Sequence, residues 1–318
     1  MKVGVVGLGS MGMGAALNLA AKGFETHGCE RREDAWAELQ AAGGRCVGRA
    51  GALPDGLDAV VVFVVNAAQA EQVLFGEASP PSGASSPADE GCLSRVVPGG
   101  VVLCCVTVAP EAARALAARV EAADRLFLDA PVSGGSKAGR AGTMTVMASG
   151  GPAAFERAGP VLDAIAGKVW RLGDEAGVGS TVKMVNQLLA GVHIATAAEA
   201  MALGLRAGAD PRALYEVITS SAGNSWMFQN RVPHILDGDD TPQSAVDIFV
   251  KDLGIVLDQA RRFTFPLPMA SAAHQLFLAA SAAGHGGRDD AFVIRVWEAL
   301  AGIELPKPAP DPGGGGGT

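Results

Sequence analysis

The stretch GVVGLGSMGMG near the N-terminus constrains the fold more than any other part of the sequence. It contains the pattern G-x-G-x-x-G as Gly7, Gly9 and Gly12, directly after a short apolar strand pattern and at the start of a helical one. The first glycine permits a tight turn, the second lets the backbone approach a pyrophosphate, and the third allows close helix–strand packing. The helix beginning near Ser10 and Met11 offers N–H groups and a positive dipole end to phosphates. The pattern predicts a dinucleotide site; a glycine-rich turn without a ligand is the alternative.

The rest of the first half alternates apolar strand patterns, such as AVVVFVV and GVVLCCVT, with helical patterns such as PEAARALAARVEAA. Valine-rich strands between helices indicate a mostly parallel sheet covered on both faces. After about residue 175 the strand patterns end, and residues 178–208 form one helical pattern, roughly 40 Å long. The sequence predicts an α/β Rossmann-type N-terminal domain (1–174), followed by an all-α C-terminal domain (175–306) and linked to it by a long interdomain helix.

Two low-complexity segments, residues 77–91 and 307–318, are poor in core-forming residues. We expect both to be mobile, the first as an insertion and the second as a disordered tail. A lid over the cofactor is the alternative role for the first segment.

Glu30 ends the second strand pattern, 18 residues after Gly12. A carboxylate there accepts hydrogen bonds from ribose hydroxyls and repels a 2′-phosphate, so we predict NAD rather than NADP as the cofactor. Arg31 and Arg32 follow directly. Arg31 is assigned to the cofactor site, where a guanidinium can stack on adenine or pair with a 2′-phosphate; a solvated helix start is the alternative for both arginines.

Further cofactor contacts are predicted where other strand patterns end, because ligands bind outside the carboxyl ends of parallel strands. Val64, Val65 and Asn66 end one such pattern, and Thr107 ends another. For Thr107, a helix N-cap is the alternative role.

Composition excludes several other classes of function. The net charge is −8 and no run of Lys and Arg occurs, so we expect no nucleic-acid partner. The longest uniformly apolar run, AVVVFVV, is far shorter than the about 20 residues that span a bilayer, and the first strand pattern starts at Lys2, so we expect neither a membrane span nor a signal peptide. The five cysteines show no C-x-x-C spacing, which indicates reduced thiols in a cytoplasmic protein, and no residues have metal-ligand spacing.

Three later stretches follow the glycine motif in order: DAPVSGG (129–135), GVGSTVKMVNQ (177–187) and KDLG (251–254). Together the four motifs resemble the β-hydroxyacid dehydrogenase family, which includes 3-hydroxyisobutyrate dehydrogenase, tartronate semialdehyde reductase and the 6-phosphogluconate dehydrogenases. The resemblance covers about residues 1–306. It implies NAD-dependent oxidation of a small polyhydroxy acid by hydride transfer.

Lys183 matches the catalytic lysine of the family. Hydride loss from an alcohol requires a general base, and desolvation lowers the pKa of a lysine toward the working range. Lys183 stands among small and apolar residues of the predicted long helix, so we predict that it is this base; a lysine reaching out to solvent is the alternative. Asn186 and Gln187 share its helix face and are predicted to bind substrate hydroxyls. Many family members carry Asn where this chain has Gln187, so the division of roles between the two amides stays open.

The resemblance assigns the remaining contacts. Ser133, Gly134 and Gly135 offer a hydroxyl and unhindered N–H groups to the substrate carboxylate. Lys251 is placed on the nicotinamide side of the site, with a surface lysine paired to Asp252 or Asp247 as the alternative. Ser244 stands where several family members have phenylalanine, and we interpret it as making room for the polar end of the substrate.

The long apolar helix also predicts a homo-oligomer, a dimer or a tetramer, because one covering domain is insufficient to bury it. Within the family, the C-terminal domain is too short for a 6-phosphogluconate dehydrogenase. A non-catalytic dinucleotide-binding module is the alternative of a different class, and Lys183 argues against it.

Overall fold

The computed structural model describes residues 1–76 and 90–306. The chain divides into two units, Met1–Met184 and a second one from Val185 onward, and this division falls within a single long helix. The two low-complexity segments lie outside the described residues, apart from Glu90 and Gly91.

The described part of the first unit contains one nine-stranded sheet with the order β3-β2-β1-β4-β5-β6-β8-β7, and β9 pairs with β8. The strands are β1 (Lys2–Val6), β2 (Glu25–Cys29), β3 (Arg45–Val47), β4 (Leu57–Val62), β5 (Val96–Cys104), β6 (Leu126–Asp129), β7 (Val132–Ser133), β8 (Met144–Ser149) and β9 (Ala166–Gly173). Strands β1 to β6 pair in parallel, whereas β8 runs antiparallel to β6 and β7 and parallel to β9. The order 3-2-1-4-5-6 is that of a dinucleotide-binding sheet.

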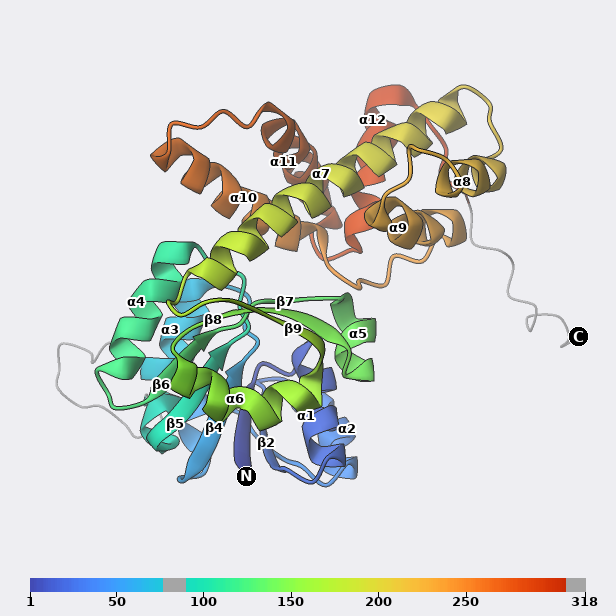
Figure 1. Ribbon diagram of the computed structural model, residues 1–318. Coiled ribbons are helices and arrows are strands. Elements are labelled where there is room, and N and C mark those ends of the chain that lie inside the picture. Colours follow the sequence, from blue (N-terminus) through green and yellow to red (C-terminus); the bar gives the residue numbers. More distant parts are fainter. Residues whose placement is uncertain (77–89, 307–318) are drawn as a thin grey trace, which may run out of the picture. The chain divides into compact units, whose positions relative to one another are not determined.

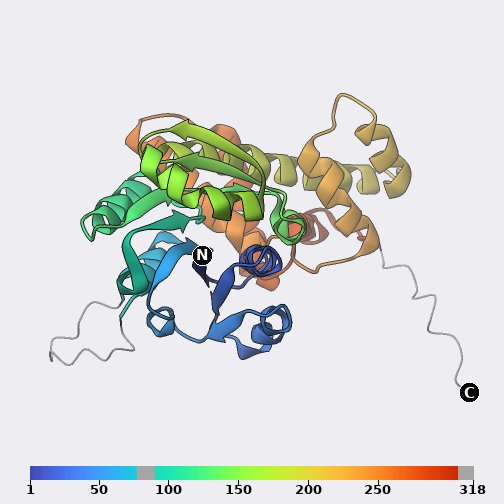
Figure 2. The same cartoon turned by 60° about the horizontal axis from the view of Figure 1, so that its bottom comes forward.

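Helices cover both faces of this sheet (Figure 1). They are α1 (Gly12–Ala21), α2 (Trp36–Ala41), α3 (Ala67–Phe75), α4 (Pro110–Glu121), α5 (Gly135–Ala141) and α6 (Pro152–Ile165). Along β4 the side chains alternate between two cores: Ala59 and Val61 pack with α1 and α6, whereas Val60 and Val62 pack with α3 and α4. Because this part of β4 is buried on both faces, its successive residues are apolar, which explains the continuous apolar run in the sequence. Figure 2 brings forward the dark blue β1–α1–β2 unit, in which the glycine motif forms the first turn.

The second unit is helical. It comprises the later part of α7 (Val178–Arg206), followed by α8 (Pro211–Thr219), α9 (Trp226–Asp237), α10 (Val246–Arg262), α11 (Pro268–Ala280) and α12 (Val296–Ala301). Its core packs α7 residues such as Met201 against Val232 of α9, Leu253 of α10 and Phe277 of α11. The predicted fold class, a mostly parallel Rossmann-type domain followed by a helical domain, is confirmed.

Helix α7 is one continuous helix of 29 residues (Figure 1). Among the described helices it is the one that has the length and apolar composition to cross a membrane, with a mean hydropathy of 1.6 in its most apolar window. The core helix of a soluble protein meets the same criterion, and 39% of that window is buried within this chain. Length and composition alone therefore give weak support to a membrane span.

All five cysteines are free thiols. Burial raises the pKa of Cys29, Cys92 and Cys104 to about 12, so these thiols stay protonated and unreactive near neutral pH.

Candidate active site

The glycine motif forms the turn between β1 and α1, and its three glycines have different surroundings. Gly7 has φ +89°, and a Cβ there would lie 2.7 Å from the carbonyl oxygen of Phe63. A Cβ on Gly12 would lie only 1.8 Å from the carbonyl oxygen of Gly7. By contrast, a Cβ on Gly9 would meet no protein atom within 4 Å. The first and third glycines are therefore required by the protein itself, and the second leaves open space beside the backbone, as a bound pyrophosphate requires.

Glu30 links this turn to the end of β2. One carboxylate oxygen accepts a hydrogen bond from the N–H of Leu8 (3.1 Å), and the other accepts from the N–H of Arg32 (3.2 Å). Its side chain is 15% exposed, so the carboxylate is held in place but reachable.

A cavity of ≈ 680 Å³ lies beside the turn, within the first unit. Six of the predicted cofactor residues line it: Gly7, Gly9, Glu30, Arg31, Val64 and Val65. They come from the ends of three neighbouring strands, β1, β2 and β4, and the turns that follow them. The structure therefore brings together residues that the sequence spreads over about 60 positions.

The other predicted cofactor residues of this unit do not line the cavity. Ser10 and Met11 precede α1, and Gly12 begins it. Asn66 is the N-cap of α3, where its side chain accepts a hydrogen bond from the N–H of Gln69 (2.9 Å). Thr107 follows β5, but it is not the N-cap of α4, because Ala109 holds that position.

Lys183 lies in the second turn of α7 and is buried, with 6% of its surface exposed. Ser133 ends β7, and Gly134 and Gly135 follow with φ values of +129° and +68°. A Cβ on Gly134 would lie 2.5 Å from the Cβ of Ala138, whereas at Gly135 no atom would lie within 4 Å. The predicted carboxylate-binding turn is thus a glycine turn with open space at its second glycine.

In the second unit, Gln187 and Lys251 meet at one buried carboxylate, Asp252, which is 2% exposed. The Gln187 side-chain amide donates to one oxygen of Asp252 (2.5 Å), and the Lys251 ammonium donates to the other. Asn186 donates in turn to the side-chain oxygen of Gln187 (3.0 Å). The pairing of Lys251 with Asp252 is one of the two alternatives that its sequence position leaves open. Both the oxygen and the NH₂ group of the Gln187 side chain hydrogen-bond to other protein side chains. Asn186 is only half-buried, so part of its surface remains accessible.

Ser244 lies just before α10 and is tied to Asp290. Its carbonyl oxygen accepts a hydrogen bond from the N–H of Asp290 (2.8 Å), and its side chain hydrogen-bonds to the Asp290 carboxylate. Asp290 is fully buried, so the place of Ser244 is set by the core of the second unit.

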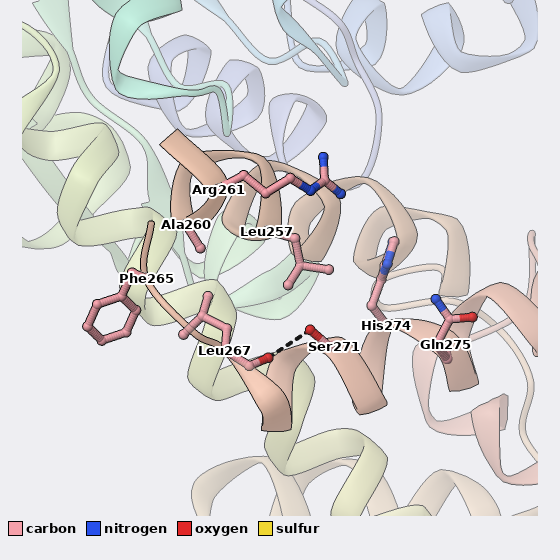
Figure 3. Close-up of a pocket in the computed structure, with 8 residues that line it drawn as sticks. All are labelled: Leu257, Ala260, Arg261, Phe265, Leu267, Ser271, His274 and Gln275. Atoms are coloured by element: carbon pink, nitrogen blue, oxygen red, sulfur yellow. Dashed lines mark hydrogen bonds between the residues drawn. The ribbon is translucent and has the colours of Figure 1, made fainter. Parts of the chain in front are cut away.

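A second cavity, of ≈ 460 Å³, lies between α10 and α11 (Figure 3). None of the predicted site residues lines it, and three of its polar side chains have protein partners. Ser271 donates to the carbonyl oxygen of Leu267 (2.8 Å), His274 bonds the carbonyl oxygen of Val250 (2.9 Å), and Arg261 pairs with Asp258 (2.6 Å). The three polar groups Ser271, His274 and Arg261 are therefore held by the protein itself.

Comparison with known proteins accounts for both units. A family model described as the NAD binding domain of 6-phosphogluconate dehydrogenase matches residues 2–173, and one described as NAD-binding of NADP-dependent 3-hydroxyisobutyrate dehydrogenase matches residues 177–297. The L-threonate dehydrogenase of Cupriavidus necator is 54% identical over 304 residues, which cover 96% of this chain and 97% of that protein. The chain belongs to the 3-hydroxyisobutyrate dehydrogenase family.

Other members of the 3-hydroxyisobutyrate dehydrogenase family give the same picture. The L-threonate dehydrogenase of Escherichia coli is 52% identical over 96% of both chains. A crystal structure described as 3-hydroxyisobutyrate dehydrogenase from Salmonella typhimurium is 49% identical, has a TM-score of 0.85, and covers 93% of this chain and 99% of its own. The protein is therefore a dehydrogenase that acts on a CH–OH group and uses a nicotinamide dinucleotide.

The cavity of the first unit fits such a cofactor, because it combines the open space at Gly9 with the reachable carboxylate of Glu30. It also contains residues that the sequence did not point to. These follow β3 or lie on and around α3: Gly48, Arg49, Ala50, Gln69, Gln72, Val73, Gly76 and Glu90. The signal for the first group was weak, since β3 has only three residues, although it ends at the same edge of the sheet as β2.

No group of three or more His, Cys, Asp or Glu residues that could hold a metal ion occurs within residues 1–76 and 90–306.

Proposed function

We propose that the protein oxidises the C2 hydroxyl of L-threonate to the 2-oxo acid with NAD. The observation that carries this proposal is the similarity to relatives named L-threonate dehydrogenase, which reaches 54% identity over 96% of the chain. By comparison, identity to the human mitochondrial 3-hydroxyisobutyrate dehydrogenase is 30% over 92% of the chain. The chain is thus much more similar to the first group than to the second.

Lys183 acts as the general base in this proposal. The bound cofactor supplies a nicotinamide ring that accepts the hydride from C2. As the hydride leaves, the hydroxyl proton passes to the Lys183 amine, which must be neutral to take it. The Lys183 amine is largely removed from bulk solvent, since only 6% of the surface of this residue is exposed.

The remaining site residues bind and orient the substrate and cofactor. Ser133, Gly134 and Gly135 hold the substrate carboxylate through the hydroxyl and the backbone N–H groups of their glycine turn. Asn186 binds a substrate hydroxyl, and Gln187 holds Asp252 and orients Asn186, in keeping with their hydrogen bonds. Lys251 contacts the nicotinamide end of the cofactor.

A substrate panel tests the proposal directly, with NAD and NADP for the oxidations and NADH and NADPH for the reduction. The panel contains L-threonate and 3-hydroxyisobutyrate for oxidation and tartronate semialdehyde for reduction. We expect kcat/KM to be at least about tenfold higher for L-threonate with NAD than for any other pair, which corresponds to about 1.4 kcal/mol. If the enzyme prefers either of the other two compounds, that compound is its substrate and the assignment of L-threonate is wrong. Cofactor binding without turnover of any of them would favour a non-catalytic module.

The choice of NAD over NADP depends on Glu30 in this proposal. Replacement Glu30→Gln keeps an oxygen that can accept from the N–H of Leu8 but removes the charge that repels a 2′-phosphate. We expect the ratio of kcat/KM for NAD to that for NADP to fall about tenfold, a change of about 1.4 kcal/mol. Arg31 and Arg49, which line the same cavity, are available to pair with the phosphate. The matched control is Glu33→Gln, since Glu33 is exposed and does not line the cavity; an unchanged ratio in Glu30→Gln would contradict the role.

Ser244 makes room for the polar end of a four-carbon acid in this proposal. Ser244→Phe is expected to raise KM for L-threonate about tenfold, because the ring fills space that the substrate needs. Ser244→Ala distinguishes the steric effect of the ring from the loss of the hydrogen bond, since this variant loses the contact with Asp290 but adds no bulk. Wild-type kinetics for L-threonate in Ser244→Phe would show that the side chain at this position does not affect substrate binding.

We also propose a homo-oligomer, a dimer or tetramer, that forms through α7. Val178, Val182, Val185 and Leu189 are 36–52% exposed and recur at intervals of three and four residues, so they form one apolar stripe along the helix. Measurement of the molecular mass in solution by light scattering tests this, and a monomer would contradict it. The free thiols fit a reducing compartment, and we assign the protein to the cytoplasm.

A further inference from the structure

Asp129 is a fully buried carboxylate that ends β6. It accepts hydrogen bonds from the backbone N–H groups of Gly177 and Ser180, both at 2.9 Å, and from the hydroxyl of Ser180 at 2.8 Å. The Ser149 hydroxyl lies 3.4 Å from one of its oxygens and itself accepts from the N–H of Gly179 (2.9 Å). Two buried side chains at the ends of β6 and β8 thus accept hydrogen bonds from three backbone N–H groups around the start of α7, those of Gly177, Gly179 and Ser180.

This junction leaves no room for α7 to shift toward the sheet. Gly177 has φ +96°, and a Cβ there would lie 2.9 Å from the carbonyl oxygen of Pro110. A Cβ on Gly179 would lie 2.3 Å from the carbonyl oxygen of Met147 and 3.0 Å from that of Asp129. The two glycines of the GVGS segment therefore let the first turn of the helix touch the strand ends, where the buried side chains hold it.

The surroundings of Asp129 act on its pKa in two opposite directions. Burial raises the pKa of Asp129, and the hydrogen bonds from Ser180, Gly177 and Ser149 act in the opposite direction. The N-terminus of a 29-residue helix also carries a partial positive charge that favours an anion within its first turn. The same contacts that stabilise the carboxylate fix the helix start.

We propose that Asp129 is a positioning residue for the reaction: it fixes the first turn of α7 and thereby the place of the Lys183 amine. Ser180 and Lys183 are three residues apart on the same helix face, so a displacement of the first turn is passed directly to the lysine. This inference rests on the proposed function, in which Lys183 is the base. Asp129 itself acts only through the helix.

The test compares Asp129→Asn with Ser180→Ala in the full chain. The asparagine keeps one oxygen for backbone N–H groups but replaces the other by a donor; the alanine removes only the hydroxyl and leaves both backbone bonds. We expect kcat for L-threonate to fall about 100-fold in Asp129→Asn, because a misplacement of about 1 Å has effects of that size, and by a smaller factor in Ser180→Ala. KM for NAD should stay within about twofold, since neither residue lines the cofactor cavity.

The deciding readout is the deuterium isotope effect on kcat with L-threonate deuterated at C2. A misplaced base slows the chemical step, so the isotope effect should rise in both variants. A role confined to folding would lower the amount of active protein and leave the isotope effect at its wild-type value. The matched control is Asp58→Asn: Asp58 also accepts a backbone N–H, from Lys2 at 2.8 Å, and pairs with Arg157, but it lies on β4. It should leave kcat and the isotope effect unchanged.

The outcomes separate this inference from the proposed function. Wild-type kcat and isotope effect in Asp129→Asn, with Lys183→Ala inactive, would overturn the positioning role and leave the base in place. Wild-type turnover in Lys183→Ala would overturn the base and the positioning role together.

Discussion

Lys183→Ala is expected to lower kcat for L-threonate oxidation by about 10²- to 10⁴-fold, the range that a positioned general base contributes. The Lys183 side chain is buried and stands in the helix turn that follows the contacts of Asp129, and alanine has no group that can take up the proton. NAD affinity should be unchanged, because Lys183 does not line the cofactor cavity. Absorbance of the reduced cofactor measures kcat, and titration calorimetry measures NAD binding.

Two further variants define the role of the amine. Lys183→Arg keeps the positive charge but cannot release a proton near neutral pH, so it should be as inactive as the alanine variant. Lys168→Ala is the matched control: Lys168 lies on β9 of the same unit, with its ammonium over the ring of Trp170 at 4.9 Å. Full turnover in Lys183→Ala would refute the mechanism, and activity in Lys183→Arg would show that the residue acts through its charge alone.

The main features of the fold were predictable because they depend on local patterns. The glycine motif and the valine-rich runs identify β1, α1 and β4 without any tertiary information, and the loss of strand patterns after residue 175 identifies the helical part. The direction of β8 was not predictable in this way. It is antiparallel to β6 and β7 because the short connections through Val132–Ser133 and α5 reverse the direction of the chain. The apolar residues of a strand do not indicate in which direction the strand runs. The three-residue β3 was missed because it is too short to show a period.

That Gly7, Gly9 and Glu30 line one cavity was predictable, because local sequence patterns place each of them directly after a strand or in the turn that follows it. Contacts between distant segments were not predictable. Gln187 and Asp252 are 65 positions apart, and their hydrogen bond arises from the packing of α7 against α10. A shared helix face indicates that Asn186 and Gln187 lie near Lys183, but only the partner of each amide separates their roles.

The largest expected effect on stability is at Arg231, which is 5% exposed and forms a two-point ion pair with the fully buried Asp290. Its Nε lies 2.5 Å from one carboxylate oxygen and its Nη2 lies 3.2 Å from the other. Arg231→Met leaves a buried carboxylate without its cation, so we expect the free energy of unfolding to fall by about 3–5 kcal/mol. Urea denaturation measures the loss. The matched control is Arg212→Met, whose ion pair with Asp237 is about 60% exposed on both sides and should contribute less than about 1 kcal/mol.

The loss at Arg231 should also depend on pH. Burial raises the pKa of Asp290 from 3.8 to about 7, although Arg231 pulls it down. Because the folded-state pKa lies above the unfolded-state value, the contribution of this carboxyl group is most favourable below about pH 4 and declines as the pH rises through 7. Without Arg231 the folded-state pKa rises further, and the decline continues to higher pH. The stability difference between wild type and Arg231→Met should therefore be larger at pH 8.5 than at pH 6. The same comparison between Asp290→Asn and the double variant Arg231→Met/Asp290→Asn should show no such dependence, since the titrating carboxyl group is then absent from both proteins. A difference between wild type and Arg231→Met that is the same at both pH values would contradict the assignment.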